Sequence, residues 1–186
     1  SPYAASKIAA DHLIESYYKT YKVPAVILRP FNTYGPRQSE RAVIPTVIRQ
    51  IIDPNCKKIK IGDTSPIRDF NFVKDTANAF IKLASANNVE YGNAYNAGSG
   101  RSVSIGETIK IINKITKNKK VYETSKERLR PQTSEVFNLI ASSKKLELLT
   151  GWKPKTSLES GLEKTITWWK KNLNKNIINN SSDYKI

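Results

Sequence analysis

The sequence predicts an α/β fold, and three observations support this prediction. Short β-rich stretches alternate with longer stretches of helical periodicity along the chain, which is the order expected of layered α/β proteins. Hydrophobic residues make up 39% of the 186 residues, enough to form a core. Few stretches match a buried parallel strand as clearly as AVIL at 25–28. We therefore expect the back half of a larger fold, with a further strand before the first helix.

The first part of the chain is expected to hold a helix, a strand, a loop and a second helix. Residues 3–21 contain alanines and apolar residues at helical spacing, without internal Pro or Gly. Residues 24–30, PAVILRP, are a β-rich run between prolines and predict a buried strand. Residues 31–41 predict a loop, and residues 42–52 predict a helix with Pro45 in its first turn.

The middle of the chain repeats this alternation. Residues 58–62, KIKIG, alternate in polarity and predict a strand that ends at the glycine. DTSPIRD at 63–69 predicts a turn-rich loop, and FNFV at 70–73 predicts a short strand. A helix is predicted over 74–86, and AYNAGSG at 94–100 predicts a strand that runs into glycines.

Helix-capping signals mark the last third of the chain. Ser104 and Glu107 form a capping-box pattern, which predicts the start of a helix over 104–116. The remaining predictions are a strand at 120–123, a helix at 142–151 closed by Gly151, a helix at 157–173 opened by Ser157, and a polar tail from 174 to 186.

The composition limits the classes of function. The formal net charge is +15, but the basic excess is spread along the chain, and no zinc-finger or RNA-binding pattern accompanies it. No apolar run approaches the roughly 20 residues of a membrane span. The single cysteine, Cys56, allows no internal disulfide. We expect a cytoplasmic protein with no nucleic-acid partner, no membrane association and no metal site.

The opening stretch SPYAASK places Tyr3 and Lys7 four residues apart. On a helix these two side chains share one face. A nearby ammonium favours the phenolate form of a tyrosine, and the phenolate is the form that can act as a general base. The small residues between them would let a cofactor ring and a substrate approach. The same spacing also occurs on ordinary helix surfaces, so the pair alone leaves both interpretations open.

Further motifs follow the opening stretch in a fixed order. They are RPFNTYGPRQ, PIRDFNFVKD, NAGSGRSVSI, RLRPQTSEV and LLTGWKPKTSLESGLEKTITWW. In this order they resemble the later segments of the extended short-chain dehydrogenase/reductase family, in its branch of NAD-dependent nucleotide-sugar epimerases and 4,6-dehydratases. RPFNTYGPRQS and RPQTSEV are most similar to the UDP-N-acetylglucosamine 4,6-dehydratase-like group of legionaminic-type pathways. The resemblance extends to about residue 173.

This resemblance implies roles for individual residues. Tyr3 would take the proton from the sugar 4-hydroxyl while hydride passes to NAD, and Lys7 would support it and bind the nicotinamide ribose. Guanidinium groups suit phosphate oxygens, which agrees with the arginines implied in the diphosphate site. The remaining implied contacts are Pro30 and Phe31 at the nicotinamide, Asn32, Arg68 and Arg130 at the nucleotide diphosphate, and Asn96, Ala42 and Val43 around the nucleotide pocket.

The resemblance also implies an organisation. Residues 1–35 would be the last part of a Rossmann-like doubly wound domain, and residues 36–173 mainly a small α/β lobe that binds the nucleotide sugar, with segments returning to the Rossmann-like sheet. No G-x-G-x-x-G loop follows a strand, so the NAD-binding half is expected upstream, and the chain alone is expected to be inactive. A homodimer is expected through the helix over 3–21.

Three alternatives stay open at this point. One is a nucleotide-sugar 4-epimerase, which shares the Tyr/Lys pair without the elimination of water. Another is a non-catalytic nucleotide-sugar-binding fragment, and the third is a basic nucleic-acid-binding domain. Several conspicuous residues have structural interpretations: Arg37 and Arg41 as solvated loop charges, His12 as a helix-surface residue, Cys56 as a loop thiol, and Trp152, Trp168 and Trp169 as packing anchors.

Overall fold

The computed structural model describes residues 1–129 and 135–173. Its helices are α1 Pro2–Tyr21, α2 Val43–Ile52, α3 Val73–Ala84, α4 Ile105–Thr116, α5 Lys144–Thr150 and α6 Leu158–Asn172, with a 3₁₀ turn η1 at Lys126–Arg128. Its strands are β1 Ile27–Pro30, β2 Thr33–Tyr34, β3 Ile59–Ile61, β4 Ile67–Arg68, β5 Asn71–Phe72, β6 Ala94–Ala97, β7 Val103–Ser104, β8 Tyr122–Thr124 and β9 Asn138–Leu139.

Three helix ends lie at the predicted local signals. The Ser104 side chain accepts a hydrogen bond from the Glu107 amide, and the Glu107 side chain bonds back to Ser104, which completes the capping box of α4. The Ser157 side chain caps α6. Gly151 ends α5 in the left-handed conformation at φ 66°, which a glycine adopts without steric cost. The predictions for these three helix ends are confirmed.

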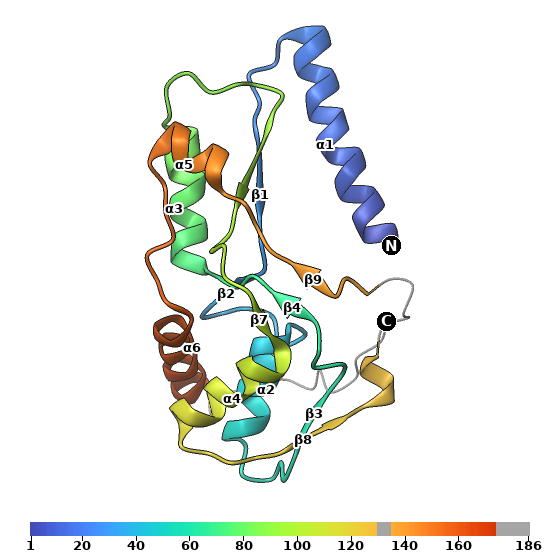
Figure 1. Cartoon of the computed structure of the whole chain (residues 1–186), viewed down its shortest axis with the longest axis vertical. Coiled ribbons are helices and arrows are strands. Elements are labelled where there is room, and N and C mark those ends of the chain that lie inside the picture. The colour runs from blue at the N-terminus through green and yellow to red at the C-terminus, as the bar shows by residue number, and fades with distance from the viewer. Residues whose placement is uncertain (130–134, 174–186) are drawn as a thin grey trace.

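Strand pairing confirms the α/β class. Strand β1 pairs in parallel with β6, β2 with β5, and β3 with β8. Strand β4 lies between β7, which is antiparallel to it, and β9, which is parallel. Every parallel pair joins segments separated by a helix, as in a βαβ arrangement. Figure 1 shows β4, β7 and β9 near the middle of the molecule and β3 beside β8 at its lower end.

Two predicted loops contain short strands. The interpretation of residues 31–41 and 63–69 as loops was wrong at β2 and β4, which are two residues long each. Their turn-rich composition is a local signal, whereas their pairing with β5 and β9 is a tertiary contact that composition does not encode. Strands β7 and β9 were not predicted for the same reason.

Two apolar clusters hold the chain together. The larger one lies between α2, α4, α6 and the strands β2, β3 and β5, and it contains Trp169. The smaller one joins α3, β6 and α5 around Trp152, whose indole N–H donates to the Asp75 carbonyl at 3.1 Å. Trp168 is half-buried against the larger cluster. The prediction of three tryptophan packing anchors is confirmed.

Helix α1 differs from the other helices because none of its residues is buried. Figure 1 shows it apart from α3 and α5, on the other side of β1. An ion pair of 2.6 Å between Asp11 and Arg29 ties it to β1. Its apolar side chains Ile8 and Leu13 are more than half exposed, and His12 lies on its surface, as predicted.

Candidate functional site

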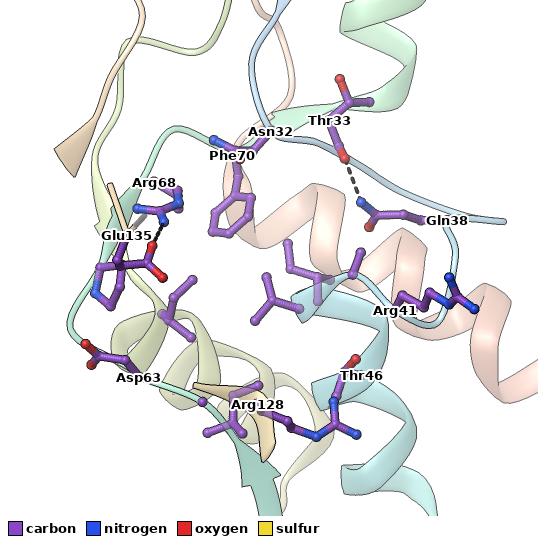
Figure 2. Close-up of a pocket in the computed structure, with 17 residues that line it drawn as sticks. Asn32, Thr33, Gln38, Arg41, Thr46, Asp63, Arg68, Phe70, Arg128 and Glu135 are labelled. Carbon is purple, nitrogen blue, oxygen red and sulfur yellow. Dashed lines mark hydrogen bonds and ion pairs between the residues drawn. The ribbon is translucent and has the colours of Figure 1, made fainter. Parts of the chain in front are cut away.

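A cavity of about 320 Å³ opens between the start of α2, the strands β3 and β4, and η1 (Figure 2). Four of the predicted substrate residues line it: Asn32, Ala42, Val43 and Arg68. They come from the β1–β2 connection, the start of α2 and β4. The fold therefore brings together residues that are up to 36 positions apart in the sequence.

The charged side chains in this cavity favour an anion. Three arginines, Arg41, Arg68 and Arg128, line it together with two carboxylates, Asp63 and Glu135. The sequence analysis interpreted Arg41 as a solvated loop charge. Arg41 is exposed, and it also lines the cavity. Guanidinium groups bind phosphate oxygens through paired N–H donors, so the excess of arginine suits a phosphate-bearing ligand.

The start of α2 adds a second feature that favours an anion. The N-cap residue Ala42 makes no side-chain cap hydrogen bond, and the first turn contains no acidic residue. The amino-terminal end of a helix carries partial positive charge and unpaired N–H groups. At the other end of α2, the Lys120 ammonium donates to the carbonyl oxygens of Gln50 at 2.8 Å and Asp53 at 2.6 Å.

Arg68 is held firmly at the cavity wall. Its Nη1 donates to the carbonyl oxygens of Ile67 at 3.0 Å and Val136 at 2.5 Å. Its Nη2 donates to a Glu135 carboxylate oxygen at 2.6 Å. The two side chains are 13% and 12% exposed. A guanidinium fixed in this way needs little reorganisation to bind a ligand.

Asn32 is positioned through Asp69. The Asn32 side-chain amide donates to the Asp69 carbonyl oxygen at 3.2 Å. The Asp69 side chain is fully buried, and its carboxylate accepts hydrogen bonds from the backbone N–H groups of Ser99, Gly100 and Ala141 and from the Ser99 hydroxyl. This carboxylate therefore fixes the turn after β4 against the loop after β6 and the chain after β9.

The predicted catalytic pair lies on α1, outside the cavity. The Tyr3 residue is 72% exposed, and the Lys7 ammonium lies 5.5 Å from the centroid of its ring. Pro30 ends β1 and is exposed, whereas Phe31 is half-buried and donates its backbone N–H to the Ala97 carbonyl oxygen at 2.9 Å. None of these four residues lines the cavity.

Two other predicted substrate residues have different outcomes. Asn96 is half-buried in β6, where it pairs in register with Arg29, and it does not line the cavity. Arg130 lies outside the described residues. The four predicted residues at the cavity and these two remain predictions as ligand contacts.

The sequence interpretation missed several lining residues. Glu135 lies within the motif RPQTSEV, but its role depends on β9 pairing with β4. Gln38 lies in GPRQ, and its side-chain amide donates to the Thr33 carbonyl at 2.8 Å, as Figure 2 shows. Asp63 follows Gly62, where a Cβ would collide with the Arg128 carbonyl oxygen. Glycine at this position lets η1 approach β3 closely.

Comparison with known protein families shows the family to which the chain belongs. A family model described as GDP-mannose 4,6 dehydratase matches residues 1–165. The chain belongs to this family.

Curated relatives resemble the chain over about half of their own length. The dTDP-D-glucose 4,6-dehydratase of Mus musculus is 34% identical over 176 residues, covering 92% of this chain and 48% of the mouse protein. The dTDP-glucose 4,6-dehydratase of Neisseria gonorrhoeae is 31% identical over 177 residues, covering 91% of this chain and 50% of the relative.

Solved structures similar to the chain have the α/β Rossmann-like fold. The UDP-glucuronic acid 4-epimerase of Bacillus cereus, in complex with UDP-glucuronic acid and NAD, superposes with a TM-score of 0.83 at 28% identity, over 92% of this chain and 53% of the epimerase. RMD from Pseudomonas aeruginosa, complexed with NADPH, superposes with a TM-score of 0.82 at 29% identity, over 92% and 57%. The predicted fold class is confirmed.

Within residues 1–129 and 135–173, no group of three or more His, Cys, Asp or Glu side chains could hold a metal ion. In the same part of the chain, no helix is both long and apolar enough to cross a membrane.

Proposed function

We propose that this chain is the nucleotide-sugar-binding part of an NAD-dependent nucleotide-sugar 4,6-dehydratase, with a UDP-N-acetylglucosamine-like substrate. The observation that carries the proposal is the anchored Arg68 guanidinium in a cavity that also contains the uncapped start of α2. Both features suit a diphosphate. Relatives named as dTDP-glucose 4,6-dehydratases support the reaction class.

Within this proposal, Arg68 and Asn32 bind the diphosphate, and Ala42 and Val43 form the cavity wall beside it. Asn96 and Arg130 complete the nucleotide site. The division of the chain at residue 35, with the nucleotide-sugar lobe after it, is part of the same proposal. So are a cytoplasmic location and the expectation that the chain alone has no turnover.

Tyr3 and Lys7 would carry the proton transfer. Among the described residues, those that would lie at the nicotinamide end of NAD are an exposed phenol beside an ammonium on α1 and Pro30 at the end of β1. When bound, NAD supplies the acceptor for the hydride from the sugar. The Tyr3 side chain would take the proton of the sugar 4-hydroxyl, with the Lys7 ammonium beside it.

A 4-epimerase is the second candidate. The epimerase from Bacillus cereus superposes on the chain as well as the dTDP-glucose 4,6-dehydratase from Bacillus anthracis does, with TM-scores of 0.83 and 0.81.

A homodimer through α1 is proposed for the complete enzyme, because Ile8 and Leu13 are exposed on a helix with no buried residue. Sedimentation of the complete enzyme tests the homodimer, and a monomer at micromolar concentration would contradict it.

Titration calorimetry with UDP tests the proposed binding site. The chain should bind UDP, and Arg68→Ala should weaken binding by about 1.5–3 kcal/mol, the range for a hydrogen bond to a charged group. Arg29→Ala is the matched control, because it removes a guanidinium and an ion pair outside the cavity. Equal UDP affinity in the parent and in Arg68→Ala would remove Arg68 from the site.

A further inference from the structure

Helix α1 is joined to the rest of the chain near its carboxyl end and near its middle. At the carboxyl end, the Tyr18 ring lies 6.1 Å from the Tyr91 ring, and it packs so closely on Gly92 that a Cβ there would collide with it. Near the middle, a carboxylate oxygen of Asp11 accepts from Arg29 Nε at 2.6 Å, and Arg29 Nη2 lies 2.6 Å from the same oxygen. Within residues 1–129 and 135–173, no other hydrogen bond or ion pair links residues 2–14 to another element.

This ion pair connects the two groups of residues that the proposed reaction must bring together. Asp11 follows Tyr3 and Lys7 at intervals of four residues, so the three side chains lie along one side of α1. Arg29 lies in β1 directly before Pro30, the residue implied at the nicotinamide. The pair therefore joins the helix that carries the proposed base to the strand that leads to the proposed cofactor contact.

A tilt of α1 about its packed carboxyl end moves Tyr3 farther than it moves Asp11. Asp11 lies seven residues before Tyr18, and Tyr3 lies fifteen residues before it. At about 1.5 Å per residue, these separations are about 10 Å and about 22 Å along the helix. A displacement of about 1 Å at Asp11 therefore becomes about 2 Å at Tyr3. A misplacement of about 1 Å at a reacting group can cost about 100-fold in rate.

We propose that Asp11 and Arg29 are positioning residues, which hold the amino-terminal half of α1 so that Tyr3 lies at a fixed distance from the end of β1. The inference rests on the proposed function, because it takes Tyr3 as the base. The side chains of Asp11 and Arg29 are 25% and 52% exposed, and an ion pair with this exposure adds little to the stability of the whole protein. Its effect is therefore expected on the placement of α1 and not on global unfolding.

Hydrogen exchange, measured by mass spectrometry on this chain, tests the placement of the helix. No residue of α1 is buried, and a helix of this length without packing is only marginally stable in water, so the protection of its amides depends on the contacts that hold it. Asp11→Ala should speed exchange over residues 2–14 by about two- to fivefold, the factor expected for an ion pair with this exposure. Alanine has the higher helix propensity, so a weaker helix would not explain the faster exchange.

Glu15→Ala is the matched control, because Glu15 forms its ion pair with Lys19 inside α1, at 2.6 Å. This variant should change exchange over the same residues by less than about twofold. Asp11→Arg combined with Arg29→Asp reverses the ion pair and should restore the parental exchange, whereas Asp11→Arg alone should not. Equal exchange in Asp11→Ala and in the parent overturns the proposal.

Turnover by an enzyme that has both halves of the fold gives the second measurement. Asp11→Ala should lower kcat by about 10–100-fold, the range for a misplaced reacting group. The KM for the nucleotide sugar should stay within about twofold of the parent value, because neither Asp11 nor Arg29 lines the cavity. The reversed ion pair should recover kcat, which a loss of stability alone would not explain.

The outcomes separate this inference from the proposed function. Parental turnover in Tyr3→Phe overturns the role of Tyr3 as the base. Loss of turnover in Tyr3→Phe, together with a parental kcat in Asp11→Ala, overturns the positioning role alone. A fall in kcat that the reversed ion pair does not recover also overturns it, because the fall would then come from the single side chain and not from its contact with Arg29.

Discussion

The buried Asp69 carboxylate gives the most demanding test of how the site is held. Its two oxygens accept four hydrogen bonds: from the Ser99 N–H at 2.8 Å and hydroxyl at 2.6 Å, from the Gly100 N–H at 2.8 Å, and from the Ala141 N–H at 3.1 Å. Asp69→Asn preserves the shape but turns one oxygen into an NH₂ group. Two of the four donors then face a donor instead of an acceptor.

The magnitude follows from these contacts. A hydrogen bond to a charged group contributes about 1.5–3 kcal/mol, and two such bonds are lost in Asp69→Asn. We expect the free energy of unfolding to fall by about 3–6 kcal/mol, measured by urea denaturation with an unchanged m-value. The UDP affinity should fall as well, because Asn32 donates to the Asp69 carbonyl oxygen.

Asp63→Asn is the control for this measurement. Asp63 is exposed, and its carboxylate also accepts from a backbone N–H, that of Ser65 at 2.8 Å. Its replacement should lower the free energy of unfolding by less than about 1 kcal/mol. If the free energy of unfolding of Asp69→Asn lies within about 1 kcal/mol of the parent value, the inference that this carboxylate holds the three segments together is refuted.

Two further predictions concern tyrosines. Burial raises the pKa of Tyr34, and the carboxylates of Asp75 and Glu159 raise it further. The neutral phenol therefore stabilises the fold below the ordinary tyrosine pKa of about 10, and this stabilisation is lost as the pH rises above that value. Tyr34→Phe removes the hydrogen bond to the Leu158 carbonyl and should lower the free energy of unfolding by about 0.5–1.5 kcal/mol at neutral pH. Above pH ~10, the free energy of unfolding of this variant should decline less steeply than that of the parent, measured by denaturation at several pH values. An equally steep decline in both proteins would count against burial as the cause. Tyr3→Phe, in an enzyme that has both halves of the fold, should cut turnover by about 10²–10⁴-fold, and a near-parental rate would contradict its role as the base.

The helices were predictable because their signals are local. The capping box at Ser104 and the glycine at position 151 lie within a few residues of the ends they define. The short strands were not predictable in the same way. Strand β4 has only two residues, and it exists because β7 and β9 lie on either side of it. Two-residue strands carry no usable periodicity of their own.

In the candidate site, too, residues in local motifs could be predicted, whereas residues that depend on distant contacts could not. Arg68 and Asn32 could be found because they belong to motifs with a recognisable order, and both line the cavity. Glu135 stood in a quoted motif but was not selected. Its contact with Arg68 joins residues 67 positions apart, and nothing near either residue in the sequence specifies the pairing of β4 with β9.

The separation of these strands has a consequence for the order of folding. Arg68 meets its partner only after a further 67 residues have been made. At synthesis rates of about 5–20 residues per second, this delay is on the order of several seconds. Helix formation takes about a microsecond or less, so α2 and α3 can form long before the strand that completes the cavity is available. Contacts between residues distant in sequence slow folding, because the loop between them must close first. The candidate site should therefore stay incomplete in a nascent chain until β9 has been made, and until then Arg68 lacks its counter-ion.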